Sequence, residues 1–220
     1  MIMAFRFLAR VLRSRYLGLL AAFFGLGVLA AEARQVKVVA LGDSLSAGYQ
    51  LGANDAFPVV LEAALKAKGL DVIVENAGVS GDTASGGRER LDWSVPEDAD
   101  LVIVELGAND ALRGIDPVIT EQALDDILAH LKERRIGVLL AGMLAPRNNG
   151  PEFIAAFDAI YPRLAEKHGV PLYPFFLEGV QGRADLNLTD GMHPNPKGVR
   201  AIVTGILPMV EKLVREKAAN

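Results

Sequence analysis

The sequence predicts a doubly wound α/β protein, in which a parallel β-sheet lies between layers of helices. Short runs rich in β-branched residues alternate with longer helical stretches along the chain. Several of these runs are almost continuously apolar, as strands buried on both faces of a parallel sheet are. Apolar residues at helical spacing fill the stretches between them. Together these observations imply a sandwich of helices around one sheet.

Five segments are candidate strands. In chain order they are Val36–Leu41, Val72–Glu75, Leu101–Leu106, Val138–Met143 and, with the weakest pattern, Pro171–Tyr173. Three of them run into a polar cluster that contains glycine, namely Gly42–Ser44, Asn76–Asp82 and Gly107–Asp110. In open α/β sheets the ligand site lies outside the carboxyl ends of the strands, so these clusters are expected to converge.

Four stretches are candidate helices. Two are Phe57–Lys68 and Pro151–Lys167, and the others carry apolar residues at i, i+3, i+4 and i+7: Leu124, Ile127, Leu128 and Leu131, then Val199, Ile202, Val203 and Ile206. Asn195 and Pro196 are predicted to be the N-cap and first residue of the last helix. Pro208 is predicted to kink or interrupt it.

The first 33 residues resemble an export signal. Four arginines precede the uncharged run Leu17–Ala31, and Ala31-Glu32-Ala33 has the small-x-small form of a cleavage site. The run has 15 residues, whereas a bilayer crossing needs about 20. We therefore expect cleavage, an exported (periplasmic or secreted) protein and no stable membrane insertion afterwards, with an uncleaved anchor as the alternative. Residues 34–220 then form one domain.

Charge and cysteine content exclude several functions. Without residues 1–33, the chain keeps 19 basic and 26 acidic side chains, a net charge of −7. Nucleic-acid binding needs a basic surface, so it is not expected. The chain has no cysteine, which excludes disulfides, thiol catalysis, cysteine-based zinc sites and lipid attachment to cysteine.

Two serines, Ser44 and Ser46, follow the first candidate strand. Each could be a nucleophile or could begin a helix. Serine is a common N-cap, but Ala47 and Tyr49 stand where a capping box would place Glu or Gln after Ser44 and Ser46. The segment is not the G-x-S-x-G elbow of α/β-hydrolases either. Ser44 lies nearer the strand end and is the better candidate.

His193 is the candidate base. It lies in the loop Thr189–Pro194, three residues after Asp190, so a short turn could set the carboxylate against the imidazole as a catalytic triad requires. Asp-Gly is also a common turn dipeptide, so spacing alone leaves a solvated loop histidine open. His130 and His168 lie among charged residues in helical stretches and are interpreted as solvated.

Taken together, these clusters resemble the GDSL, or SGNH, hydrolase family over nearly the whole chain after residue 33. The matching blocks are Gly42–Leu45, Ser80–Asp82, Gly107–Asp110 and Asp190–Pro194, in the family's order. Further stretches are similar to the exported thioesterase/arylesterase/lysophospholipase-type subgroup: "LGDSLSAGY", "GDT", Leu112–Gly114 and Ala159–Pro162. The resemblance implies a flavodoxin-like three-layer α/β/α sandwich with a five-stranded parallel sheet, and no cofactor.

The resemblance also implies a role for each site residue. Ser44 would be the nucleophile, His193 the general base and Asp190 the residue that orients the imidazole, while Ser46 would be structural. The oxyanion hole would consist of the backbone N–H groups of Ser44 and Gly81 and the side-chain amide of Asn109. The expected activity is hydrolysis of carboxylic esters or thioesters through an acyl-enzyme.

Apolar residues that flank the clusters favour acyl esters as substrates, either small molecules or lipid-like. The expected lining of the site is Leu112, Ile115, Met143, Leu144 and Met192. The loop Asp110–Pro117 is predicted to fold over the acyl chain, with Gly114 as its hinge.

Other functions remain open at this point. A carbohydrate O-acetylesterase of the same family should offer aromatic platforms, and Trp93 is the one tryptophan. An exported binding protein without chemistry is another alternative. A metal-dependent phosphoesterase could use Asp43, Asp190 and His193 as ligands, although no metal site is predicted. The sequence gives no oligomeric state.

Overall fold

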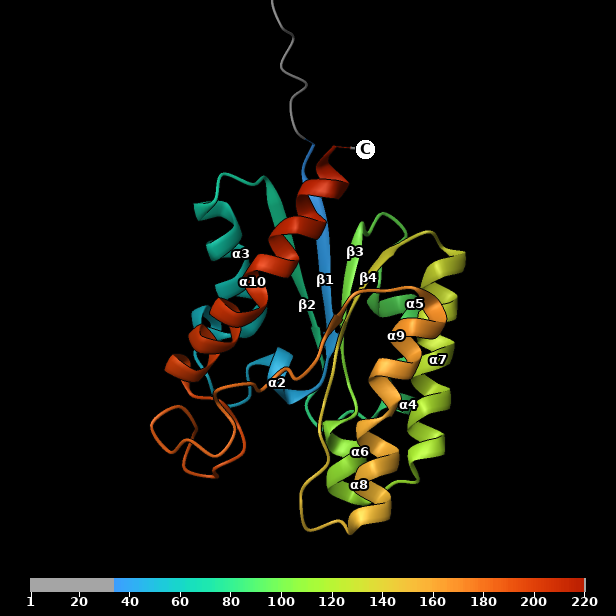
Figure 1. Ribbon diagram of the computed structural model, residues 1–220. Coiled ribbons are helices and arrows are strands. Elements are labelled where there is room, and N and C mark those ends of the chain that lie inside the picture. The colour runs from blue at the N-terminus through green and yellow to red at the C-terminus, as the bar shows by residue number, and fades with distance from the viewer. Residues whose placement is uncertain (1–33, 220) are drawn as a thin grey trace, which may run out of the picture. The chain divides into compact units, whose positions relative to one another are not determined.

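The computed structural model describes residues 34–219, and the predicted export segment lies outside them. Its centre is a parallel sheet of five strands in the order β2-β1-β3-β4-β5 (Figure 1). The strands are β1 (Val36–Gly42), β2 (Val72–Gly78), β3 (Leu101–Glu105), β4 (Gly137–Ala141) and β5 (Leu172–Tyr173). The five-stranded parallel sheet predicted from the sequence is confirmed.

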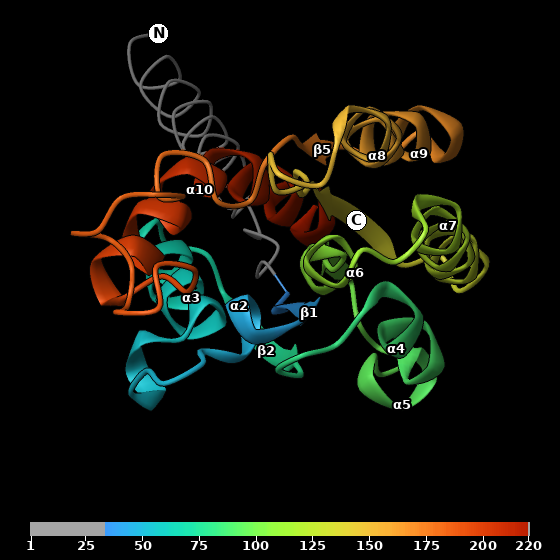
Figure 2. The same cartoon turned by 90° about the horizontal axis from the view of Figure 1, so that it is seen from below.

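Helices cover both faces of this sheet. Helices α3 (Phe57–Ala67) and α10 (Pro196–Ala218) pack on one face, and α7 (Pro117–Glu133) and α9 (Ile160–His168) pack on the other (Figure 2). Shorter elements complete the chain: α2 (Ser44–Ala47), η1 (Ala53–Asp55), α4 (Ala84–Glu89), α5 (Leu91–Ser94), α6 (Ala108–Arg113) and α8 (Pro151–Asp158). The predicted three-layer α/β/α sandwich is therefore confirmed.

The two long helices begin and pack as their sequences predict. Asp116 caps α7 by accepting the N–H of Val118, and Asn195 caps α10 by accepting the N–H groups of Lys197 and Gly198. The helix-spaced apolar residues of both are buried: Leu124, Ile127, Leu128, Leu131, Val199, Ile202, Val203 and Ile206. Burial of this apolar stripe, more than helix propensity, stabilises each helix against the sheet.

Proline affects two helices differently from the prediction. The stretch Pro151–Lys167 forms two helices, with a break at Ala159. Pro162 has no N–H for the carbonyl of Asp158, so the helical hydrogen bonding fails at that place. In contrast, α10 continues through Pro208, so the predicted interruption is wrong, and the alternative of a kink stays a prediction.

The strand order reverses at β1, which places a crevice at the carboxyl ends of β1 and β3. After β1 the chain adds β2 on one side and then β3 on the other. Such a switch point is where open α/β sheets bind ligands. The carboxyl ends point toward the bottom of Figure 1 and toward the viewer in Figure 2.

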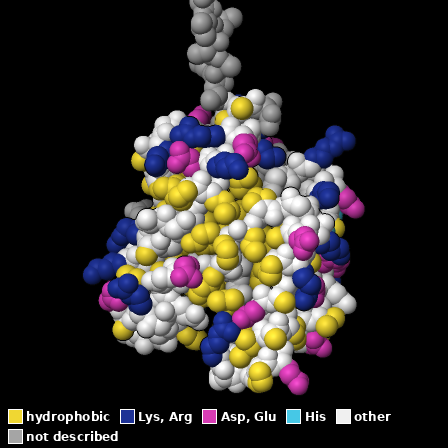
Figure 3. Space-filling view, viewed as in Figure 1, with side chains coloured by type: hydrophobic (Ala, Val, Ile, Leu, Met, Phe, Trp, Pro, Cys, Tyr) yellow, Lys and Arg dark blue, Asp and Glu magenta, His cyan; other side chains and the backbone are white. Residues whose placement is uncertain are grey.

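Hydrophobic side chains also gather on the face shown in Figure 3, in a band down its middle. A shallow groove between β5 and α10 is lined by Tyr173, Pro208, Met209 and Leu213 among others.

Within residues 34–219, no helix combines the length and the apolar character needed to cross a bilayer.

Candidate active site

Ser44, His193 and Asp190 lie in a continuous chain of hydrogen bonds. Ser44 is the first residue of α2 and follows directly from β1, whereas Asp190 and His193 lie in the loop before α10. The Ser44 Oγ atom is 2.9 Å from His193 Nε2, and His193 Nδ1 is 2.7 Å from Asp190 Oδ2. The fold thus joins side chains that are 149 positions apart in sequence.

The loop itself fixes the carboxylate of Asp190. Its Oδ1 accepts the backbone N–H groups of Met192 and His193 at 2.9 and 3.0 Å. The hydrogen bond from the His193 N–H contributes most, and that from Met192 next, to lowering the pKa of Asp190 to about 2. The carboxylate therefore stays ionised. The Leu188 N–H donates to the His193 carbonyl at 2.7 Å and closes the loop. An ionised, oriented carboxylate holds the histidine in the Nδ1–H tautomer.

Tyr49 packs on the imidazole of His193. The two ring centroids are 4.4 Å apart and the planes are tilted by 36°. Tyr49 follows α2, the short helix that begins at Ser44, so the same segment supplies the serine and a wall for the histidine.

The two serines have distinct environments. Asp43, and neither serine, is the N-cap of α2, because its carboxylate accepts the Leu45 N–H at 2.9 Å. Ser46 is fully buried and donates to Glu105 Oε2 at 2.7 Å, which places it in the core. Ser44 lines the cleft described below.

The predicted oxyanion donors differ in their position relative to the cleft. Asn109 lines the cleft, but its Nδ2 already donates to Asp43 Oδ2 at 3.0 Å and to the Asp82 carbonyl at 2.9 Å. Gly81 adopts a positive φ of 88° and its carbonyl accepts from Arg113 at 2.7 Å. It is not among the residues that line the cleft.

A cleft of about 240 Å³ opens beside Ser44 and His193. Four of the five predicted lining residues border it: Leu112, Met143, Leu144 and Met192. The expectation for Ile115 was wrong, because Ile115 does not line the cleft. The chain turns at Gly114 with a φ of 65°, and the Ile115 N–H bonds back to the Asp110 carbonyl at 3.0 Å.

The segment Asp110–Pro117 also differs from the predicted loop. Its first residues belong to α6, which begins at Ala108 and ends at Arg113. Leu112 therefore stands on a helix, with 56% of its surface exposed. Three residues that the sequence analysis did not select complete the apolar wall: Pro146, Phe175 and Leu177. The last two follow β5, so their place at the carboxyl end of a strand was the available signal.

Arg90 connects three of the polar segments behind the cleft. Its guanidinium donates to the carbonyls of Gly42 and Ala77 at 2.8 and 2.7 Å and forms an ion pair with Asp82. It therefore ties the ends of β1 and β2 to the segment after Gly81. Arg90 is almost completely buried, and no motif or periodicity indicated its role.

The other two histidines form hydrogen bonds with carboxylates outside the cleft. His130 pairs with Asp92 at 2.7 Å and His168 with Asp125 at 2.6 Å. The side chain of His168 is 9% exposed, so its interpretation as solvated was wrong. Across residues 34–219, no three Asp, Glu, His or Cys side chains are grouped as metal ligands would be.

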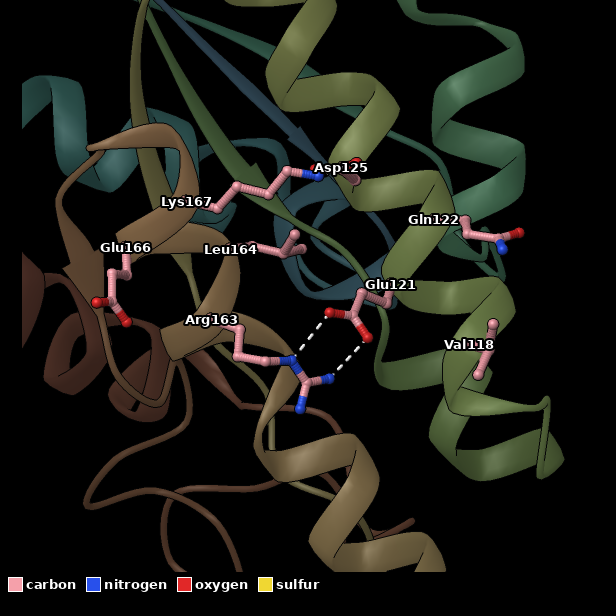
Figure 4. Close-up of a pocket in the computed structure, with 8 residues that line it drawn as sticks. All are labelled: Val118, Glu121, Gln122, Asp125, Arg163, Leu164, Glu166 and Lys167. Carbon is pink, nitrogen blue, oxygen red and sulfur yellow. Dashed lines mark hydrogen bonds and ion pairs between the residues drawn. The ribbon is translucent and has the colours of Figure 1, made fainter.

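A second hollow lies between α7 and α9 (Figure 4). Arg163 and Glu121 face each other across it in a two-bonded ion pair of 3.0 and 2.6 Å, and Lys167 pairs with Asp125 at 2.7 Å. These charges neutralise one another.

Comparison with known proteins identifies the family. The model of the GDSL-like lipase/acylhydrolase family matches residues 40–201. The chain belongs to that family. An "Arylesterase" of Vibrio mimicus is 40% identical over 169 residues, which cover 76% of this chain and 84% of that protein. "Thioesterase 1/protease 1/lysophospholipase L1" of Escherichia coli is 41% identical over 175 residues, covering 79% and 83%.

A solved structure agrees with the family assignment. AlinE4, an SGNH-hydrolase family esterase, is 44% identical with a TM-score of 0.69, over 81% of this chain and 96% of that chain. The chain is therefore an ester-hydrolysing enzyme with the SGNH hydrolase fold.

Proposed function

We propose that this SGNH hydrolase cleaves carboxylic esters and thioesters through an acyl-enzyme on Ser44. The hydrogen-bonded chain from Ser44 through His193 to Asp190 carries the proposal. Ser44 Oγ attacks the acyl carbon while His193 Nε2 takes its proton, and Asp190 stabilises the imidazolium. Collapse of the tetrahedral intermediate releases the alcohol or thiol, which receives that proton. Water then repeats the sequence and frees the acid.

The oxyanion is bound by N–H groups of Ser44, Gly81 and Asn109 in this proposal. Because both amide hydrogens of Asn109 have acceptors in the free enzyme, one of them must be shared with the substrate oxygen or turn toward it. Its bond to the Asp43 carboxylate limits how far the amide can rotate. Donors held in this way stabilise charge that develops only in the transition state.

Acyl esters suit the cleft better than acetylated sugars. Leu112, Met143, Leu144, Phe175 and Leu177 give it a largely apolar wall beside the triad. Trp93, 76% exposed on α5, is not among the residues that line the cleft. The names of the relatives, arylesterase and thioesterase/lysophospholipase, agree with an acyl substrate.

We also propose that residues 1–33 direct export and that residues 34–220 act as one hydrolase domain outside the cytoplasm. The basic start, the short apolar run and the small-x-small site of the sequence support this. Mass spectrometry of the exported protein should find a new N-terminus close to Arg34. A retained Met1 would instead support an uncleaved anchor.

A substrate panel tests the proposed activity. It compares p-nitrophenyl acetate and octanoate, an acyl-CoA, a lysophospholipid and an acetylated sugar, each with and without EDTA. We expect hydrolysis of the octanoate ester, unaffected by EDTA, and of at least one of the thioester or the lysophospholipid. Preference for the acetylated sugar would support the O-acetylesterase alternative, and EDTA-sensitive activity would support the metal-dependent one.

A further inference from the structure

A buried carboxyl group lies directly behind the turn that carries Ser44. Glu105 is the last residue of β3, the central strand, and its side chain is fully buried. The strand register places it opposite Gly42, the residue at which β1 ends. Glutamate is rarely buried so completely unless it is paired, so this side chain calls for an explanation.

One oxygen of Glu105 contacts both sides of the nucleophile turn. Oε2 accepts the Ser46 hydroxyl at 2.7 Å and the backbone N–H of Asp43 at 3.4 Å. The two donors flank Ser44 in the sequence. The turn Asp43–Ser46 is thus held from within the core at both ends, while Ser44 Oγ points to His193.

The glycine before the turn leaves space for this arrangement. A Cβ atom on Gly42 would overlap both the Ser46 hydroxyl and Glu105 Oε2. No side chain fits there without displacing the contact between the strand end and the turn. The absence of a side chain at position 42 is therefore explained by the position of the carboxyl group.

The environment disfavours the charged form of Glu105. Burial, and then the negative charge of Asp43, raise the pKa of Glu105 well above its usual range. Its Oε1 has no hydrogen-bond partner among the described residues. Asp43, whose carboxylate accepts a hydrogen bond from Asn109, is the other acid of this pair. A second charge beside it would oppose the oxyanion that the site has to stabilise.

Given the esterase function proposed above, we propose that Glu105 is a positioning residue: its carboxyl group fixes the Asp43–Ser46 turn and so holds the Ser44 hydroxyl in line with His193. Its role depends on the place of Oε2 and not on a charge. The shape of the side chain should therefore matter more than its ability to ionise. Glutamine keeps that shape without the acid, whereas aspartate keeps the acid and withdraws the oxygen from both donors.

The test compares three variants, Glu105→Gln, Glu105→Asp and Glu105→Ala. For each variant, kcat and KM are measured on p-nitrophenyl acetate, and so is the rate at which a fluorophosphonate labels the protein. Thermal unfolding of each variant is followed by circular dichroism. Val102→Ala is the matched control, because Val102 is equally buried in the same strand but does not touch the turn. A displacement of about 1 Å at a reacting group can cost on the order of 10²-fold in rate.

We expect Glu105→Gln to keep kcat and the labelling rate within about threefold of the wild-type values. Glu105→Asp and Glu105→Ala should each lower kcat and the labelling rate by about ten- to a hundredfold. In these two variants KM should change by less than about threefold. Val102→Ala should lower thermal stability alone. If Glu105→Ala does not fold, the order of the Gln and Asp variants decides.

Two results would overturn the inference: a folded Glu105→Asp or Glu105→Ala variant with the wild-type kcat, or a Glu105→Gln variant as impaired as Glu105→Asp. Failure of the esterase proposal has a different signature. In that case the wild-type protein itself would neither hydrolyse the ester nor react with the fluorophosphonate.

Discussion

Replacing Leu112 by serine should weaken the enzyme on long acyl chains and spare it on short ones. Leu112 stands at the rim of the cleft with 56% of its surface exposed. Full burial of a leucine side chain contributes about 1.5–3 kcal/mol, so an acyl chain that covers the exposed half gains about 1–1.5 kcal/mol there. Since 1.4 kcal/mol is about tenfold, Leu112→Ser should lower kcat/KM for p-nitrophenyl octanoate about five- to tenfold.

The acetate ester has only a methyl group as its acyl chain and can cover little of this side chain, so its kcat/KM should change by less than about twofold in the same variant. Ile115→Ser is the matched control: Ile115 is three residues away in the sequence but does not border the cleft, and its replacement should change neither substrate. Steady-state kinetics of both variants on both esters give the answer. Equal losses on the two chain lengths, or an Ile115→Ser variant that behaves like Leu112→Ser, would refute the reasoning.

Three further substitutions test the site. Ser44→Ala should lower kcat by roughly 10⁴-fold or more, since triad residues act as a unit, while Ser46→Ala, which removes only one of the two bonds from the turn to Glu105, should lower kcat far less; the reverse order would disprove the assignment. Asn109→Ala should lower kcat about 10²–10³-fold with little change in KM, whereas a large KM effect with kcat intact would make Asn109 a substrate-binding residue. Burial raises the pKa of Asp43 from 3.8 to about 6. Between these two pH values the folded protein holds a proton on Asp43 that the unfolded chain has lost. The free energy of unfolding should therefore fall by about 3 kcal/mol as the pH rises from about 4 to 6. Asp43→Asn should flatten this part of the curve in urea unfolding, and an unchanged slope would contradict the burial argument.

The sequence predicted the sheet because the sheet depends on simple patterns, whereas patterns gave only candidates for the triad and the family resemblance gave their roles. Strands buried on both faces are apolar throughout, and parallel strands bring their carboxyl ends together whatever their separation in the chain. Ser44, Asp190 and His193 could be chosen because each belongs to a polar cluster at such an end or in the loop before the last helix. The roles of Gly81 and Asn109 came from family resemblance, and spacing alone would not have suggested them.

The groups that support the site were harder to predict. Glu105 ends an apolar run and was counted as part of the strand, because one polar residue does not change a periodicity. Arg90 lies between the short helices α4 and α5, and nothing in its neighbours indicates that it reaches the carbonyls of two strands. Ile115 was misplaced because the turn at Gly114 depends on backbone hydrogen bonds, which hydropathy does not reveal.

Covalent labelling tests whether Ser44 is the nucleophile of an ester-hydrolysing triad. The protein is treated with a fluorophosphonate, and the modified peptide is identified by mass spectrometry. We expect one adduct, on Ser44, that is absent in Ser44→Ala and forms far more slowly in His193→Ala. An adduct on another residue, or ester hydrolysis that persists without any adduct on Ser44, would contradict it.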